Sequence, residues 1–114
     1  MSDTIFSKIL RKEIPADIVH EDEMCMAFRD INAQAPTHIL IIPRKAFRNI
    51  AEMGDEDGPL VGHLFKTARD LARSLGVEES GYRLVINNGA DAGQTVHHLH
   101  IHLLAGRSFR WPPG

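Results

Sequence analysis

The sequence predicts an α+β domain, in which one long helix and a short N-terminal helix pack on an antiparallel sheet of about five strands. Apolar residues repeat at helical spacing between residues 57 and 75, and shorter segments on either side are apolar and β-branched, as is typical of strands. The chain has 114 residues, enough for one hydrophobic core, so we expect a single domain over residues 1–114.

The elements before the long helix follow from local patterns. Residues 4–13 (TIFSKILRKE) carry apolar side chains at helical spacing and predict a short helix, which Pro15 closes. Residues 18–30 predict two short strands around an acidic turn at residues 21–23. Residues 37–43 (THILIIP) predict a mostly buried strand, because most of them are apolar or β-branched.

The long helix and the elements after it carry clear boundary residues. The side chain of Asp57 can cap the start of this helix, and Gly76 can terminate it. Residues 82–87 (YRLVIN) predict a strand, and residues 88–94 (NGADAGQ) predict the turn that follows it. The tail RSFRWPPG is expected to be extended because of its two prolines. The buried helix face is expected to comprise Leu60, Val61, Leu64, Phe65, Ala68, Leu71, Ala72 and Leu75.

Composition limits the classes of function. The formal net charge of −2 offers no basic surface for a nucleic acid, and we expect no such partner. The first twenty residues are repeatedly interrupted by charge, which excludes a signal peptide or membrane span there, so we expect no membrane partner. The single cysteine, Cys25, cannot form an internal disulfide and is expected to be a small core residue. We therefore expect a cytoplasmic protein.

Histidines alternate with apolar residues along the last predicted strand, residues 95–104. In a strand, His98, His100 and His102 share one face, and the other face carries Leu99, Ile101 and Leu103. Three interpretations are open: a solvated polar row, a metal site, or a row that carries out chemistry on a substrate. The outer two Cβ atoms lie about 13 Å apart, so one ion cannot readily bind all three rings. Two adjacent rings could share an ion, but no paired cysteines or nearby acidic ligand accompany them, and we expect no metal and no cofactor.

Nucleophilic or acid–base chemistry is the third interpretation. A neutral imidazole is a good nucleophile near neutral pH and can leave again. Just upstream, Gly89 and Gly93 permit close approach of the backbone to an anionic group, and Thr95 adds a hydroxyl. A glycine turn is by itself more often only a connection, but its place before the histidines favours an anionic substrate.

The segment His98-Leu99-His100-Ile101-His102-Leu103-Leu104 resembles the histidine-triad motif of the HIT superfamily. The segments TIFSKILRKEIPADIVHEDE, AFRDINAQAPTHILIIPRK and GYRLVINNGADAGQTV and the terminal WPPG extend the resemblance to the Hint branch over nearly the whole chain. This resemblance implies the HIT-like fold, a homodimer, and purine nucleoside phosphoramidase activity. That activity hydrolyses an adenosine or guanosine 5′-phosphoramidate to a nucleoside monophosphate and an amine. Alternatives are a dinucleoside polyphosphate hydrolase of the same superfamily, a non-catalytic nucleotide-binding protein and a metal-binding protein.

The resemblance also implies roles for individual residues. His100 is implied as the nucleophile that is transiently nucleotidylated, supported by His98 and His102, with His38 assisting through a hydrogen bond. Asp30 is implied to bind the ribose hydroxyls, and Ile31 to lie against the base. The remaining implied nucleotide contacts are Asn87, Gly93, Gln94 and Thr95 around phosphate and ribose, Ile5, Phe6 and Ile9 in the adenine pocket, and Trp111 at the partner subunit's site in the homodimer.

Overall fold

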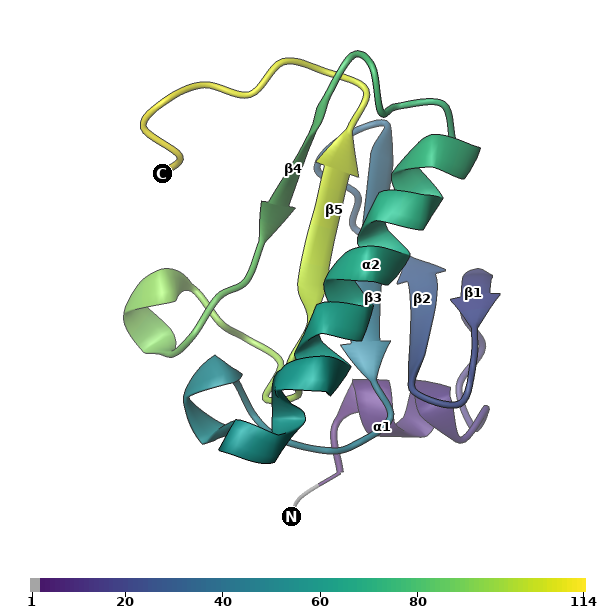
Figure 1. Cartoon of the computed structure of the whole chain (residues 1–114), viewed down its shortest axis with the longest axis vertical. Coiled ribbons are helices and arrows are strands. Elements are labelled where there is room, and N and C mark those ends of the chain that lie inside the picture. The colour runs from purple at the N-terminus through teal and green to yellow at the C-terminus, as the bar shows by residue number, and fades with distance from the viewer. Residues whose placement is uncertain (1–2) are drawn as a thin grey trace.

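The computed structural model describes residues 3–114, which form a five-stranded antiparallel sheet with a helix on each face. The strand order is β1-β2-β3-β5-β4, with α2 running across one face and α1 at one end of the other (Figure 1). The predicted fold class is confirmed. The elements are α1 (Ile5–Leu10), β1 (Ile18–Glu21), β2 (Cys25–Arg29), β3 (Thr37–Pro43), α2 (Gly58–Ser74), β4 (Tyr82–Val85) and β5 (Ile101–Ala105).

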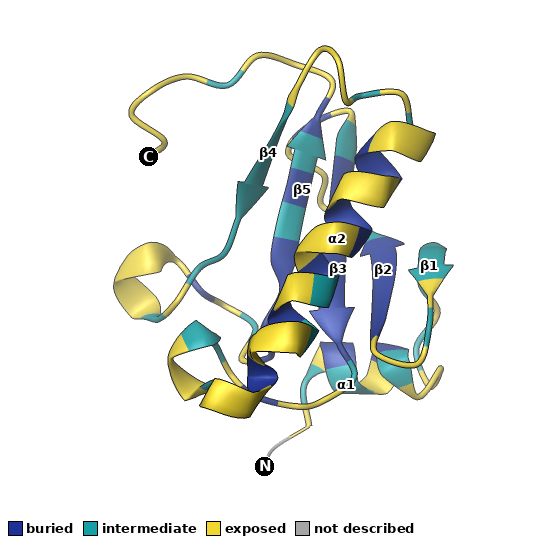
Figure 2. Ribbon diagram, viewed as in Figure 1, coloured by how far each residue is buried: buried dark blue, intermediate teal, exposed yellow. Residues whose placement is uncertain are grey.

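Alternate residues of the central strands face two separate cores, because successive side chains of a strand point to opposite faces. Strands β2 and β3 are buried over most of their length and β5 alternates between buried and half-buried residues, while the outer side of α2 is exposed (Figure 2). The core against α2 contains Cys25, Ala27, Ile39, Ile41, Leu64, Ala68, Leu99, Ile101 and Leu103. The core against α1 contains Phe6, Ile9, Met26, Phe28, Leu40 and Ile42.

Helix α1 begins at a reciprocal cap and ends earlier than predicted. The Thr4 hydroxyl accepts a hydrogen bond from the Ser7 amide at 3.1 Å, and the Ser7 hydroxyl accepts one from the Thr4 amide at 3.3 Å. The predicted helix extended to residue 13. It ends instead at Leu10, because Lys12 adopts a left-handed conformation (φ 60°) and the Glu13 amide donates to the carbonyl oxygen of Lys8.

Helix α2 occupies the predicted residues to within one position at each end, and Gly76 (φ 74°) follows it as expected. The predicted role of Asp57 as its cap is wrong. The Asp57 carboxylate instead accepts hydrogen bonds from the Gly54 amide at 2.8 Å and from Lys45 Nζ at 2.6 Å. Phe65, expected on the buried face, is 40% exposed.

The last strand is shorter than predicted, since β5 begins at Ile101 rather than at residue 95. Its pairing with β3 runs from Thr37 opposite Ala105 to Ile41 opposite Ile101, and the same register would bring Leu99 opposite Pro43. Proline has no amide hydrogen and cannot continue this ladder. The Leu99 amide donates instead to the carbonyl oxygen of Phe47, so the residues before β5 leave the sheet.

Candidate functional site

The histidines gather on the α1 face of the sheet, although only His102 lies within β5. His102 pairs with Leu40 of β3, and His38 lies two residues before Leu40, so both histidine rings are on the face of the α1 core. The His38 and His102 ring centroids are 5.2 Å apart, and those of His102 and His100 are 4.9 Å apart. The apolar residues between the triad histidines lie in the opposite core, against α2.

Phe6 of α1 contacts two of the triad rings. Its ring meets the ring of His100 edge-on at 5.0 Å between centroids and the ring of His98 at 6.2 Å. Both histidines are buried, at 7% and 2% exposure respectively. The ring of His100 is therefore held in one orientation, with little room for water around it.

Hydrogen bonds determine which nitrogen of each neutral ring carries its proton. His98 Nε2 donates to the carbonyl oxygen of Pro43 at 2.8 Å, and His100 Nδ1 donates to the carbonyl oxygen of His98 at 2.7 Å. A neutral imidazole has only one N–H, so Nε2 of His100 carries a lone pair. The sequence offered no indication of these two acceptors, because every residue has a carbonyl group.

His38 and His102 form a second hydrogen-bonded pair. His38 Nδ1 accepts from the Gln34 amide at 3.0 Å, so its Nε2 carries the proton and donates to His102 Nδ1 at 2.9 Å. In the neutral form, His102 therefore has its own proton on Nε2. This pair places the ring of His102, with its N–H donor at Nε2, next to the ring of His100, whose centroid lies 4.9 Å away.

Burial lowers the pKa of all four histidines, because removal from water disfavours the charged ring. The pKa of His102 falls to about 4. Desolvation and the neighbouring rings of His100 and His38 lower it, and together they outweigh the charge of Asp30, which raises it. The four rings are therefore neutral near pH 7, the form in which a histidine can act as a nucleophile.

Asp30 lies beside this cluster, with its Oδ2 3.5 Å from His38 Nε2. The Asn32 amide donates to Asp30 Oδ1 at 2.9 Å and fixes the carboxylate in place. The expectation that no acidic ligand lies near the histidines is wrong, because the fold brings together residues that are far apart in the sequence. Asp30, His38 and His102 each offer a ligand atom within 4.8 Å of the others, so these three residues could hold a metal ion.

Next to Asp30, Ile31 is fully exposed, at 101%. Isoleucine is usually among the most buried residue types. The exposed side chain of Ile31 therefore offers an apolar surface directly beside the Asp30 carboxylate. Across the site, Phe6 and Ile9 are buried in the α1 core, whereas Ile5 is 48% exposed.

The glycine turn is held by the side chain of Gln94. Gly89 (φ 90°) and Gly93 (φ 87°) both adopt backbone conformations that other residues rarely adopt. Gln94 Nε2 donates to the carbonyl oxygens of Arg48 at 2.7 Å and Val96 at 3.1 Å, and its Oε1 accepts from the Gly89 amide at 2.9 Å. The buried side chain of Gln94 thus shapes the turn.

The other residues expected at the site differ in their surroundings. Thr95 is exposed directly after the turn, and Asn87 is half-buried directly before it. Trp111 is 81% exposed, in the tail that leaves the end of β5 and runs past β4 (Figure 1). The structure does not bring Trp111 against the histidines of its own chain.

An antiparallel sheet that carries this histidine row beside a glycine turn defines a histidine-triad domain. The family comparison agrees, because the HIT domain matches residues 11–109. The chain belongs to the HIT family. Among residues 3–114, no helix combines the length and apolar character needed to cross a membrane.

Relatives of similar length match almost the whole chain. An uncharacterised HIT-like protein of Synechocystis is 56% identical over 98% of this chain and 97% of its own length. The crystal structure of a HIT family hydrolase from Legionella pneumophila is 48% identical, covers 98% of this chain and 100% of its own, and superposes with a TM-score of 0.96. A histidine triad nucleotide-binding protein from Candida albicans is 30% identical, over 96% of this chain and 83% of its own, with a TM-score of 0.83.

Proposed function

We propose that this protein is a nucleotide-binding hydrolase of the Hint branch, which cleaves the P–N bond of purine nucleoside 5′-phosphoramidates. One observation carries the proposal: the Nδ1 proton of His100 is committed to a main-chain carbonyl, which leaves a neutral Nε2 as nucleophile. The similarity to the Legionella protein described as a hydrolase and to the Candida protein described as nucleotide-binding supports the general class.

The proposed reaction has two steps. His100 Nε2 attacks phosphorus, the P–N bond breaks, and the amine leaves with a proton taken from solvent, while the neutral ring of His102 donates a hydrogen bond from Nε2 to the phosphate oxygens. Water then attacks the phosphorus of the nucleotidyl-His100 adduct and loses a proton to solvent, the bond from phosphorus to Nε2 of His100 breaks, and the nucleoside monophosphate is released. His38 positions His102 through its hydrogen bond to Nδ1. His98 assists through its carbonyl oxygen, which holds the ring of His100.

The nucleoside is proposed to bind between Asp30 and α1. The Asp30 carboxylate would accept hydrogen bonds from two ribose hydroxyls, and the exposed side chain of Ile31 would lie against the base. On the phosphate side, Gly93 and Thr95 would contact the anion, with Gln94 acting by holding the turn. The remaining proposed contacts are Ile5, Phe6 and Ile9 at the base and Asn87 near the ribose and phosphate.

A turnover assay tests this function. Chelator-treated protein is expected to hydrolyse a fluorogenic adenosine phosphoramidate, and to do so faster than it hydrolyses a diadenosine polyphosphate, because protonated nitrogen is the better leaving group. Both substrates are measured by kcat/KM at neutral pH. Binding of AMP without turnover of either substrate would indicate a nucleotide-binding protein, and activity that requires added metal would indicate a metal-dependent hydrolase.

We also propose that two chains form a homodimer through strand β4. Among residues 3–114, β4 pairs only with β5, so its outer edge offers unpaired backbone groups. Joining two such edges about a two-fold axis extends the sheet, and the exposed Trp111 then reaches toward the partner subunit's site. Light scattering is expected to give twice the mass of the chain at micromolar concentration, and a monomer there would exclude this arrangement.

A further inference from the structure

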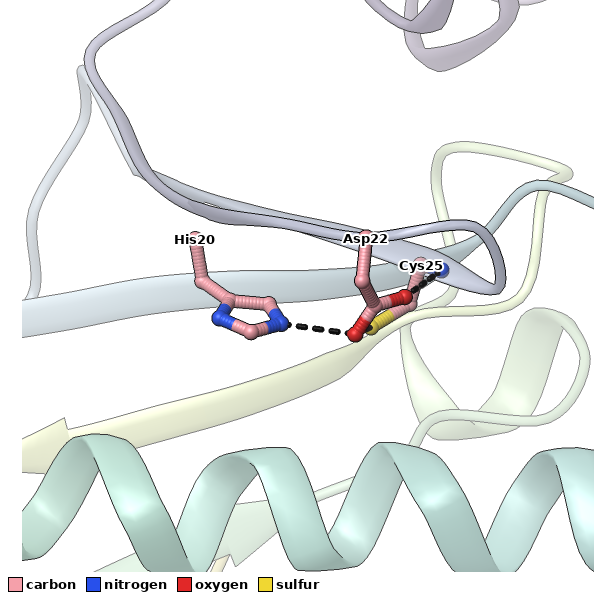
Figure 3. A group of neighbouring side chains, drawn as sticks. All are labelled: His20, Asp22 and Cys25. Carbon is pink, nitrogen blue, oxygen red and sulfur yellow. Dashed lines mark hydrogen bonds and ion pairs between the residues drawn. The ribbon is translucent and has the colours of Figure 1, made fainter.

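A second cluster of side chains that could bind a metal ion lies on the other face of the sheet, away from the triad. It comprises His20 on β1, Asp22 in the turn after β1, Cys25 at the start of β2 and His63 on α2. Figure 3 shows the side chains of His20 and Cys25 converging on the carboxylate of Asp22. The triad lies on the α1 face, whereas Cys25 belongs to the core beneath α2.

Three side chains of this cluster lie close to one carboxylate oxygen, Oδ2 of Asp22. Asp22 Oδ2 lies 2.7 Å from His20 Nε2, 2.8 Å from His63 Nε2 and 3.7 Å from Cys25 Sγ. The other carboxylate oxygen, Oδ1, accepts hydrogen bonds from the main-chain amides of Met24 and Cys25, both at 2.8 Å. The β1–β2 turn therefore holds Asp22 so that its Oδ2 faces three further potential ligands.

We propose that His20, Asp22, Cys25 and His63 bind a Zn²⁺ ion that joins the β1–β2 turn to α2. Two imidazole nitrogens, one thiolate and one carboxylate oxygen are the ligands that zinc takes, in the number that a tetrahedral site requires. One aspartate and one thiolate also balance the charge of a divalent ion. A thiolate and imidazoles select against Mg²⁺ and Ca²⁺, which prefer sites built of oxygen.

His20, Asp22 and Cys25 each offer a ligand atom within 4.8 Å of the others, and His63 adjoins this group through Asp22 Oδ2. Around a tetrahedral ion, a carboxylate oxygen and a thiolate sulfur lie about 3.5 Å apart, and an oxygen and an imidazole nitrogen about 3.3 Å apart. The separation of Asp22 and Cys25 already fits, at 3.7 Å. Both histidines need to move away from Asp22 Oδ2 to bind the ion, and His63 also needs to move toward the group formed by His20, Asp22 and Cys25. Both have room to do so, since the side chains of His20 and His63 are 36% and 27% exposed.

Binding changes the protonation of the cluster in a defined way. Burial raises the pKa of the Cys25 thiol to about 11, so the thiol enters the reaction with its proton and releases it as the Zn–S bond forms. Each histidine moves its proton from Nε2 to Nδ1 and stays neutral. Burial alone would raise the pKa of the Asp22 carboxyl, but hydrogen bonds from His20, His63 and the turn amides outweigh this effect and hold it well below its ordinary value.

Cobalt binding tests the proposal, because Co²⁺ takes the same ligands and reports on them spectroscopically. Chelator-treated full-length protein is titrated with Co²⁺ and Zn²⁺ at neutral pH. We expect one ion per chain, visible bands of tetrahedral cobalt, a thiolate-to-cobalt charge-transfer band, and a higher Tm with Zn²⁺ but not with Mg²⁺ or Ca²⁺. His20→Gln is expected to weaken Zn²⁺ binding about 100-fold or more, and Cys25→Ser to remove the charge-transfer band.

His102→Gln is the matched control, since it removes a ligand from the other cluster, that of Asp30, His38 and His102. It is expected to leave the affinity and the cobalt spectrum unchanged. Circular dichroism without metal checks that each variant is folded, and the partly exposed His20 allows its substitution without loss of the core. Zinc binding that survives in His20→Gln and Cys25→Ser but is lost in His102→Gln would overturn the proposal, as would the absence of any tetrahedral cobalt spectrum.

Discussion

His100→Ala is expected to reduce turnover of an adenosine phosphoramidate by about 10⁴-fold or more, while AMP affinity changes by less than about tenfold. The hydrogen bond from His100 Nδ1 to the carbonyl oxygen of His98 fixes the ring and leaves a lone pair on Nε2, the atom that we propose attacks phosphorus. Loss of the proposed nucleophile removes the covalent route, whereas most of the proposed contacts to the nucleotide come from other side chains.

Single-turnover kinetics and intact-protein mass spectrometry check this prediction. Wild-type protein mixed with substrate and quenched without acid is expected to show a nucleotidyl adduct, which His100→Ala does not form. His97→Ala is the control, because it replaces an exposed neighbouring histidine and should retain turnover within a few-fold. His100→Asn, which keeps a donor for the His98 carbonyl, separates chemistry from folding. Normal turnover in either His100 variant would exclude the proposed intermediate.

Acidification from pH 7 to pH 4 is expected to destabilise the folded protein by several kcal/mol. The folded-state pKa values of His38, His98, His100 and His102 lie below the unfolded value of about 6.5. Between these values the unfolded chain binds more protons, so stability falls as pH falls, and the loss levels off below the folded-state pKa. For His102, with its pKa of about 4, the loss is about 2–3 kcal/mol.

Urea denaturation at closely spaced pH values measures this effect. The free energy of unfolding is expected to fall mainly between pH 6.5 and pH 4, and the part of this fall above about pH 5 comes before the carboxylates protonate. In His102→Gln, part of this pH dependence should disappear, whereas His97→Gln serves as a control at an exposed histidine. The same urea midpoint at pH 7 and pH 5 would contradict this prediction, because it would show that protonation of the buried rings does not destabilise the folded state.

The sequence predicted most of the regular structure, because that part depends on local patterns. The apolar period of residues 57–75 identified α2, and the β-branched run at residues 37–43 identified β3 with the bounds it has in the structure. The alternation of histidines and apolar residues correctly divided that segment between the two faces of the sheet. The segment at residues 88–94 was predicted as a turn, and within it Gly89 and Gly93 adopt positive φ angles.

Predictions failed where a side chain or strand had a distant partner. The last strand begins later than predicted because Pro43 of β3 lies opposite Leu99 in the register of the pair and cannot donate a ladder hydrogen bond. Asp57 binds Lys45 rather than capping α2. Asp30 reaches His38 and His102 only through the pairing of strands that lie far apart in the sequence. Periodicity reports the face on which a residue lies, but it contains no information about which residue lies opposite.

The amino-acid sequence by itself determined the fold class, the family and the three histidines of the motif, since these follow from spacing along the chain. The tertiary structure decided the protonation of the rings and the existence of the Asp22 cluster. Both depend on acceptors and donors contributed by other elements, such as the carbonyl of Pro43 and the ring of His63 on α2. Hydrogen bonds and burial act between neighbours in space, and only folding determines which residues become neighbours.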